Sequence, residues 1–118
     1  MFELMVEDTF DAAHALRNYE GPCERLHGHT WKVQVFLKGE KLKKEGFLLD
    51  FKEIKSALKE ILKDFDHYNL NEIKYFKKQN PTSENVAKTI YELLSKKFSN
   101  LSKVTVWESG TTSASFML

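Results

Sequence analysis

The chain has 118 residues, a length that fits one domain, residues 1–118, and leaves little room for a second. Its 18 basic and 17 acidic side chains give a formal net charge of +1, and many lysines stand beside acids, as in Lys52-Glu53 and Lys59-Glu60. Nucleic-acid-binding domains usually carry a basic excess or stripe, because contacts to phosphates dominate their affinity. The charge balance therefore argues against a nucleic-acid partner.

The ends and the cysteine content bear on the cellular setting. The first ten residues carry three acids and lack the basic start and apolar run of a signal peptide. No apolar stretch approaches the roughly 20 residues that span a bilayer. The single cysteine, Cys23, allows no intramolecular disulfide. These features predict a cytoplasmic protein with no membrane partner.

Two strands are predicted in the first third of the chain. Residues 2–13 read as a strand whose alternation is imperfect, and a loop rich in turn residues follows. Residues 30–38 alternate cleanly, and only Phe36 breaks the polar side of the pattern. The apolar side consists of Trp31, Val33, Val35 and Leu37. Such alternation predicts a strand with one buried face.

The periodicity then changes to that of helices. Apolar residues recur at three- and four-residue spacing in Phe51, Ile54, Leu58, Ile61, Leu62 and Phe65. Asp50 stands where an N-cap would, and Glu53 completes a pair that resembles a capping box. Asn80-Pro81 announces a second helix over residues 82–98.

Two closing strands are predicted over residues 104–108 and 113–118, around the turn Ser109-Gly110. The order is therefore strand, strand, helix, helix, strand, strand. Strands at both ends with helices between them indicate an α+β fold, in which an antiparallel sheet carries the helices on one face. The face of the sheet without helices would be exposed to solvent in a single chain, and self-association would bury it.

Three of the four histidines fall within sixteen residues: His14, His27 and His29. His27 and His29 are two apart at the entrance to the second strand, so their imidazoles project to the same side. His14 ends the first strand and would arrive beside them if the two strands pair. Three histidines from adjacent strands suit zinc with a fourth position left for water or substrate. Three imidazoles do not select strongly among late first-row divalent metals.

Cys23 lies four residues before His27, and three roles are compatible with that spacing. Its thiolate could be a fourth ligand that closes a structural site. It could instead be a base whose pKa is lowered by a nearby metal ion. It could also be a buried cysteine without a chemical role. The sequence spacing leaves these alternatives open.

Six motifs together resemble one known family, that of the 6-pyruvoyl-tetrahydropterin synthases and 6-carboxy-tetrahydropterin synthases (QueD-type). The resemblance covers nearly the whole chain. The cysteine followed by His-Gly-His and the Asp-His-x-x-Leu-Asn sequence are specific in combination. The motifs are Phe10-Asp-Ala-Ala-His14, Cys23-Glu-Arg-Leu-His-Gly-His29, Leu49-Asp-Phe51, Asp66-His67 with Asn69-Leu-Asn71, Pro81-Thr-Ser-Glu84 and Val106-Trp-Glu108.

The resemblance implies the tunnelling fold (T-fold), a four-stranded antiparallel sheet with two helices, ββααββ, whose sheets join into an oligomeric β-barrel. It implies a homohexamer built as a dimer of trimers, with a pterin triphosphate as substrate. It also implies Zn²⁺ on His14, His27 and His29, and Cys23 as general base.

Further roles are implied for residues later in the chain. Asp66 and His67 would form a proton-relay pair contributed by a neighbouring subunit, and Glu108 would bind the amino-pyrimidine edge of the pterin. Thr82, Ser83 and Glu84 would lie near the substrate. Each of these acids also has a simpler interpretation. Glu84 would complement the dipole of the second helix, Asp66-His67 would be a charged pair at a helix end, and Glu108 would be exposed near a turn.

Three reactions of this family start from 7,8-dihydroneopterin triphosphate. The cysteine motif and the compact length resemble most the 6-carboxy type, which releases acetaldehyde and triphosphate and serves queuosine and other deazapurines. The 6-pyruvoyl reaction is one alternative. Cleavage to 6-hydroxymethyl-dihydropterin for folate is another, because Glu24 directly follows Cys23. A zinc-stabilised binding or assembly protein without catalysis, and an unrelated zinc hydrolase, are the alternatives of a different class.

Overall fold

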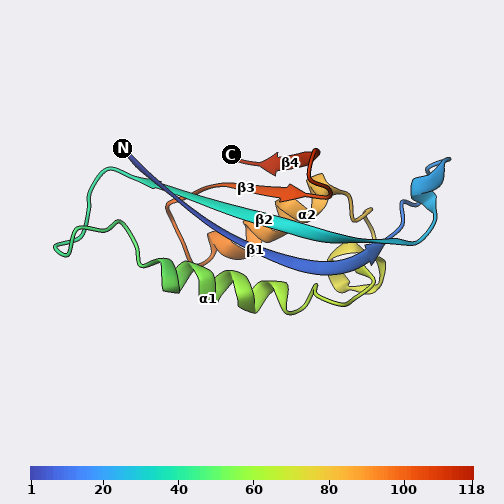
Figure 1. Cartoon of the computed structure of the whole chain (residues 1–118), viewed down its shortest axis with the longest axis horizontal. Helices are drawn as coiled ribbons and strands as arrows, with labels where there is room; N and C mark the ends of the chain where they lie inside the picture. The colour runs from blue at the N-terminus through green and yellow to red at the C-terminus, as the bar shows by residue number, and fades with distance from the viewer.

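The computed structural model describes the backbone of residues 1–118 and every side chain except that of Cys23. Its strands are β1 (Phe2–His14), β2 (His27–Gly39), β3 (Leu101–Trp107) and β4 (Ser113–Phe116), and its α-helices are α1 (Phe51–Leu62) and α2 (Ser83–Ser95). The strands form one antiparallel sheet in the order β1-β2-β3-β4. The predicted α+β class and the ββααββ order are confirmed (Figure 1).

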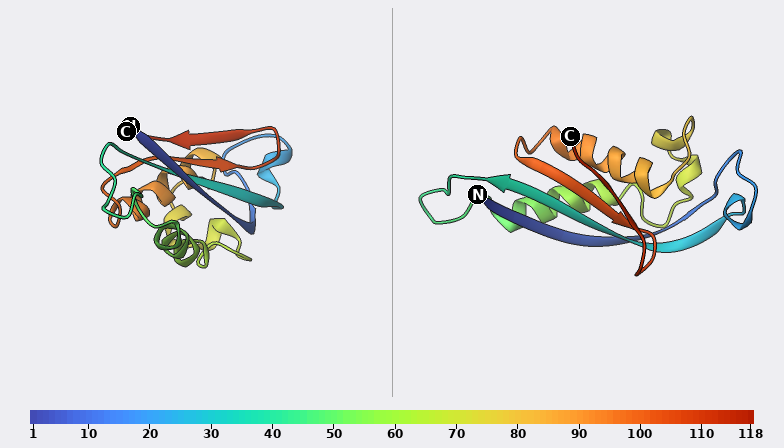
Figure 2. Two further views of the ribbon diagram at one scale, coloured as in Figure 1. Left: turned by 60° about the vertical axis from the view of Figure 1, so that its left-hand side comes forward. Right: turned by 90° about the horizontal axis from the view of Figure 1, so that it is seen from above.

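Both helices cover the same face of the twisted sheet (Figure 2). Helix α1 packs against β1, and α2 packs against β3 and β4. The apolar residues of β2 predicted to face inward are fully buried in the layer between sheet and helices, at Trp31, Val33, Val35 and Leu37. This packing explains why the alternation of β2 was readable, since every second residue enters the core.

The predicted Asp50 cap is confirmed, whereas several predicted element ends differ from the structure. The Asp50 side chain accepts a hydrogen bond from the backbone N–H of Lys52, and Thr82 caps α2 in the same way through Asn85. Helix α1 ends at Leu62, although the predicted apolar stripe continued to Phe65. Phe65 is nevertheless fully buried, because the turn after α1 folds back onto the core. Helix α2 ends at Ser95 instead of residue 98.

Strand β2 begins at His27, three residues before the predicted start. The segment His27–Thr30 already alternates in burial. Its inward residues are histidines, so the alternation of apolar and polar residues that predicted the strand does not extend to them. Strand β3 also begins earlier, at Leu101, and β4 ends at Phe116. The extension of β2 matters most, since it places two histidines within the sheet.

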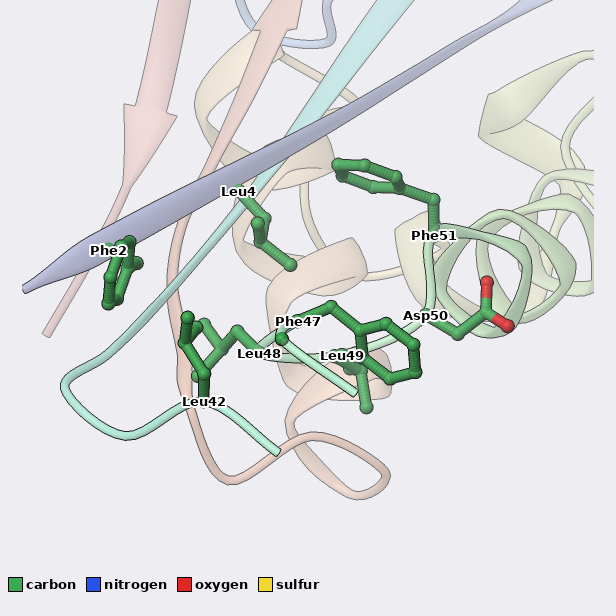
Figure 3. Close-up of a pocket in the computed structure, with 9 residues that line it drawn as sticks. Phe2, Leu4, Leu42, Phe47, Leu48, Leu49, Asp50 and Phe51 are labelled. Atoms are coloured by element: carbon green, nitrogen blue, oxygen red, sulfur yellow. The ribbon is translucent and has the colours of Figure 1, made fainter. Parts of the chain in front are cut away.

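An apolar pocket of ≈ 310 Å³ lies near the start of β1, at the other end of this strand from His14. Figure 3 shows Phe2 and Leu4 of β1 facing Leu42, Phe47 and Leu48 of the loop that leads to α1. The carboxylate of Asp50, at its rim, is engaged in capping α1. This pocket therefore offers a surface for packing and lacks the groups of a reaction site.

Among the helices that the structure describes, none is long and apolar enough to cross a membrane.

Candidate metal centre

The pairing of β1 with β2 brings the three histidines together. His14 stands directly opposite His27, and Ala12 stands opposite His29. Their ring centroids are 4.7 Å apart for His14 and His27, 5.1 Å for His14 and His29, and 4.8 Å for His27 and His29. One ring nitrogen of each lies within 4.8 Å of the others. The predicted convergence of the three imidazoles is confirmed.

Backbone carbonyls orient two of the rings. Nδ1 of His14 donates a hydrogen bond of 2.7 Å to the carbonyl oxygen of Pro81, and Nδ1 of His27 donates one of 2.7 Å to that of Arg25. A carbonyl oxygen can only accept, so each Nδ1 carries a proton. In the neutral ring Nε2 then presents a lone pair, which is the usual arrangement of metal-binding histidines.

Burial disfavours the charged form of His14. Its side chain is only 2% exposed, and this burial lowers the pKa of His14 below its ordinary value, against the raising effects of the Pro81 carbonyl and the Glu108 carboxylate. Nε2 of His14 and Nε2 of His29 are the only fully buried side-chain polar atoms without a hydrogen-bond partner in the described part of the chain. An unsatisfied buried acceptor is costly. A cation bound by neighbouring ring nitrogens would satisfy such atoms.

Trp31 provides one wall of the cluster. Its ring stands edge-on to His14 at 4.8 Å and to His29 at 5.5 Å between centroids, and its Nε1 donates to the carbonyl oxygen of Ala12. Since Trp31 is completely buried, the histidines are shielded from water on that side. Such a setting strengthens the interaction between a cation and its ligands, because the local dielectric is low. The residues present therefore fit a divalent metal ion.

An open cleft of ≈ 530 Å³ is lined by one residue of the histidine cluster, His29. It lies between the end of β1, the start of β2 and the segment 67–69, so that His29 and His67 line the same cleft. Backbone hydrogen bonds tie this segment to β1, from His67 N–H to the Asp11 oxygen and from Ala13 N–H to the Tyr68 oxygen. The segment that carries the predicted proton-relay pair is thus fixed against β1.

Asp66 and His67 contact each other directly. Oδ2 of Asp66 lies 3.0 Å from Nδ1 of His67, and Oδ1 accepts a hydrogen bond of 2.8 Å from the backbone N–H of Asp11. The Asp11 hydrogen bond, followed by the one from His67, lowers the pKa of Asp66 below its ordinary value. His67 has a φ of 65°, in the left-handed region that a non-glycine residue seldom adopts. Backbone strain of this kind tends to occur at functional sites.

Glu108 lies closer to the histidines than its predicted role required. It directly follows β3, and its Oε1 is 3.1 Å from Nε2 of His14 and 3.9 Å from Nε2 of His29. The side chain is 32% exposed. Glu108 therefore belongs to the immediate surroundings of His14 and His29.

The other predicted residues are less closely associated with the cluster. Thr82 serves as the cap of α2, and Ser83 and Glu84 make no described contact with the histidines, so their part in substrate binding stays a prediction. Cys23 belongs to the 3₁₀ turn Pro22–Glu24, but its side chain lies outside the described residues. Its predicted role as a base is untested.

The sequence did not identify three residues that hold the site together. Pro81 accepts the hydrogen bond of His14. Asn71 and Asn80 each bind both backbone groups of one residue in the segment after His14: Ala15 for Asn71 and Arg17 for Asn80. Asn71 stood within a family motif and Asn80 at a helix start, so the sequence drew attention to both residues. The sequence could not predict which residues they bind, because these lie more than fifty positions away.

Comparisons with known proteins agree on the relationship. A sequence profile of the 6-pyruvoyl tetrahydropterin synthase family matches residues 3–117. A dihydroneopterin monophosphate aldolase of Pyrococcus furiosus is 39% identical over 103 residues, 85% of this chain and 83% of that protein. A 6-carboxy-5,6,7,8-tetrahydropterin synthase of Synechocystis is 36% identical over 99 residues, 80% of this chain and 75% of that protein. The structure of Caenorhabditis elegans 6-pyruvoyl tetrahydropterin synthase superposes with a TM-score of 0.91 at 29% identity, covering 99% of this chain and 95% of that one.

Proposed function

The chain belongs to the 6-pyruvoyl tetrahydropterin synthase family of pterin-converting lyases, and we propose that it acts on 7,8-dihydroneopterin triphosphate. The proposed products are 6-carboxy-5,6,7,8-tetrahydropterin, acetaldehyde and triphosphate. The observation that carries this proposal is the convergence of three imidazoles on one point, in a chain that belongs to this family. Such a conversion requires a metal centre and a proton-transfer group.

The proposed ion is Zn²⁺, held by Nε2 of His14, His27 and His29. When bound, a divalent ion supplies Lewis-acid polarisation of the substrate's oxygen atoms. The protein contributes the orientation of the rings through the Pro81 and Arg25 carbonyl oxygens, and Trp31 excludes water from one side. Imidazole also suits other late first-row metals, so the choice of zinc rests on the family relationship.

The remaining residues would bind the pterin and move protons. The Glu108 carboxylate can accept two parallel hydrogen bonds from the ring N–H and amino group of the pterin edge. Cys23 is the proposed base that removes a proton from the substrate side chain. His67 would accept or return protons near neutral pH while Asp66 holds its ring. In the assembled protein, we expect this pair to come from a neighbouring subunit.

Side-chain cleavage to a 6-hydroxymethyl pterin is the second candidate reaction. The relative from Pyrococcus furiosus that is 39% identical is named as an aldolase of dihydroneopterin monophosphate. Glu24, next to Cys23, offers a carboxylate as an alternative base for that chemistry. The 6-pyruvoyl reaction is the third candidate. Several relatives at 34–39% identity carry the name 6-carboxy-5,6,7,8-tetrahydropterin synthase, which favours the first.

We further propose that the protein is a homohexamer, formed by two trimers. Strands β1 and β4 are the two edges of the sheet, and an edge strand readily pairs with another chain. Apolar side chains are also exposed, among them Met5 at 43% and Phe51 at 51%. Burial of such surface against copies of the chain would stabilise a small domain.

Product analysis after incubation with 7,8-dihydroneopterin triphosphate tests the proposed reaction. We expect equal amounts of acetaldehyde and a 6-carboxy pterin, and no product from enzyme treated with a chelator. If the main product is a 6-pyruvoyl or a 6-hydroxymethyl pterin, the proposed reaction is wrong and the corresponding alternative reaction is correct. Binding of the substrate without any turnover would contradict catalysis and favour a binding or assembly protein.

A further inference from the structure

The position of Glu108 against the histidines is not explained by pterin binding. Its Oε1 lies 3.1 Å from Nε2 of His14 and 3.9 Å from Nε2 of His29. These two nitrogens are the same buried atoms that lack a hydrogen-bond partner in the described part of the molecule. The carboxylate therefore approaches both nitrogens closely without forming a hydrogen bond of acceptable geometry to either.

The contact with His14 brings two acceptors together. The proton of this imidazole is on Nδ1, which donates to Pro81, so Nε2 presents a lone pair to the carboxylate. An ionised carboxylate has acceptor oxygens only. Two acceptors at 3.1 Å repel each other unless a positive charge lies between them or beside both. A cation bound to the histidines would supply that charge.

The distances suit a shared ion. Zinc binds histidine nitrogen at about 2.0–2.1 Å and carboxylate oxygen at about 2.0–2.2 Å in tetrahedral geometry. Two ligand atoms around such an ion are therefore about 3.3 Å apart. The observed separations from His14 and His29, 3.1 and 3.9 Å, lie on either side of this value. At this site, the ligand atoms that lie within 4.8 Å of one another are those of the three histidines alone, so Glu108 is close to two of the three. A movement of its partly exposed side chain would bring Oε1 to the place of a fourth ligand.

We infer that Glu108 supplies the fourth metal ligand when no substrate is bound, and that the pterin displaces it. The second half of this inference rests on the proposed function, in which the pterin edge takes the hydrogen bonds of the same carboxylate. Glu108 can make such an exchange because it follows the last residue of β3 and its side chain is 32% exposed. The fourth coordination position of the metal would then become free for substrate only when a pterin is bound.

The experiment uses the full chain loaded with Co²⁺, whose visible spectrum reports the identity and number of its ligands. We expect Glu108→Gln to shift the visible bands and to weaken Co²⁺ binding at least tenfold in competition with a chelator, since loss of even an indirect partner of a metal ligand costs 10–100-fold. Glu92→Gln, an exposed acid on α2, is the matched control and should change neither. Glu108→Asp, whose side chain is shorter, should give the same spectral shift as Glu108→Gln.

Identical spectra for wild type, Glu108→Gln and Glu108→Asp, with each variant folded by circular dichroism, would overturn the ligand assignment. Displacement is tested by adding 7,8-dihydroneopterin to the wild-type Co²⁺ protein. A spectral change toward that of Glu108→Gln supports displacement. Binding of the pterin by fluorescence with an unchanged spectrum overturns displacement. If no pterin binds, the proposed function fails, whereas the assignment of Glu108 as a ligand is judged by the variants alone.

Discussion

Asn80 links the metal centre to a segment that is distant in the sequence. Its Oδ1 accepts a hydrogen bond of 2.8 Å from Arg17 N–H, and its Nδ2 donates one of 2.9 Å to the Arg17 carbonyl oxygen. The next residue, Pro81, accepts the hydrogen bond that orients His14. Replacing Asn80 by alanine therefore loosens both chain segments that meet at this metal ligand.

The structure sets the size of the expected effect. Asn80→Ala removes two partly buried hydrogen bonds, each worth about 1 kcal/mol, so we expect a loss of about 2 kcal/mol in the free energy of unfolding. The affinity for metal should fall about 10- to 100-fold, because the His14 ring loses its fixed orientation. Asn80 does not contact the histidines. If its loss only lowered the stability of the fold, the affinity for metal would change much less than this.

Urea unfolding of the metal-free protein gives the stability, and competition with a chromophoric chelator gives the affinity. Gln79→Ala is the matched control, because its side chain makes a single exposed hydrogen bond to Tyr75. This control should lose less than about 0.5 kcal/mol and bind metal normally. Equal affinities for metal in Asn80→Ala and Gln79→Ala would refute the role of Asn80 as a positioning residue.

Three further predictions concern the chemistry and the stability. Cys23→Ala should retain the metal and lose product formation, and departure of the metal with the thiol would show that Cys23 is a ligand instead. Chelation should abolish turnover while the circular dichroism spectrum stays largely unchanged, whereas unfolding on metal removal would indicate a structural ion. The Asp11 hydrogen bond lowers the pKa of Asp66, so the ionised carboxylate stabilises the fold above about pH 4, and this contribution is lost as the pH falls further. The urea midpoints of wild type and Asp66→Asn should therefore converge on acidification, and a gap independent of pH would contradict this explanation.

The regular elements were predictable because burial leaves a periodic trace in the sequence. Trp31 and its neighbours in β2 alternate as the sheet requires, and Asp50 caps α1 as its position indicated. The ends of elements were less accurate where polar residues face inward. His27 and His29 extend β2 toward the site, and a histidine does not carry the apolar signal of a core residue.

The convergence of the three histidines was also predictable, because their spacing in two strands determines which side they face. The contacts that prepare them were not. His14 and Pro81 are 67 positions apart, and His14 meets Glu108 only because β3 lies beside β2 in the sheet. A hydrogen bond between distant residues depends on the final packing and leaves no local pattern. The sequence therefore predicted which histidines converge and could not predict the distant residues that orient them.

Metal content per chain tests the central claim most directly. Elemental analysis of the purified wild-type protein after dialysis should find one divalent ion per chain. His29→Ala should lose this ion, and His67→Ala, which changes the histidine outside the cluster, should keep it. Retention of a full equivalent of metal by folded His29→Ala, or none in the wild type after incubation with Zn²⁺, would contradict a metal centre built from His14, His27 and His29.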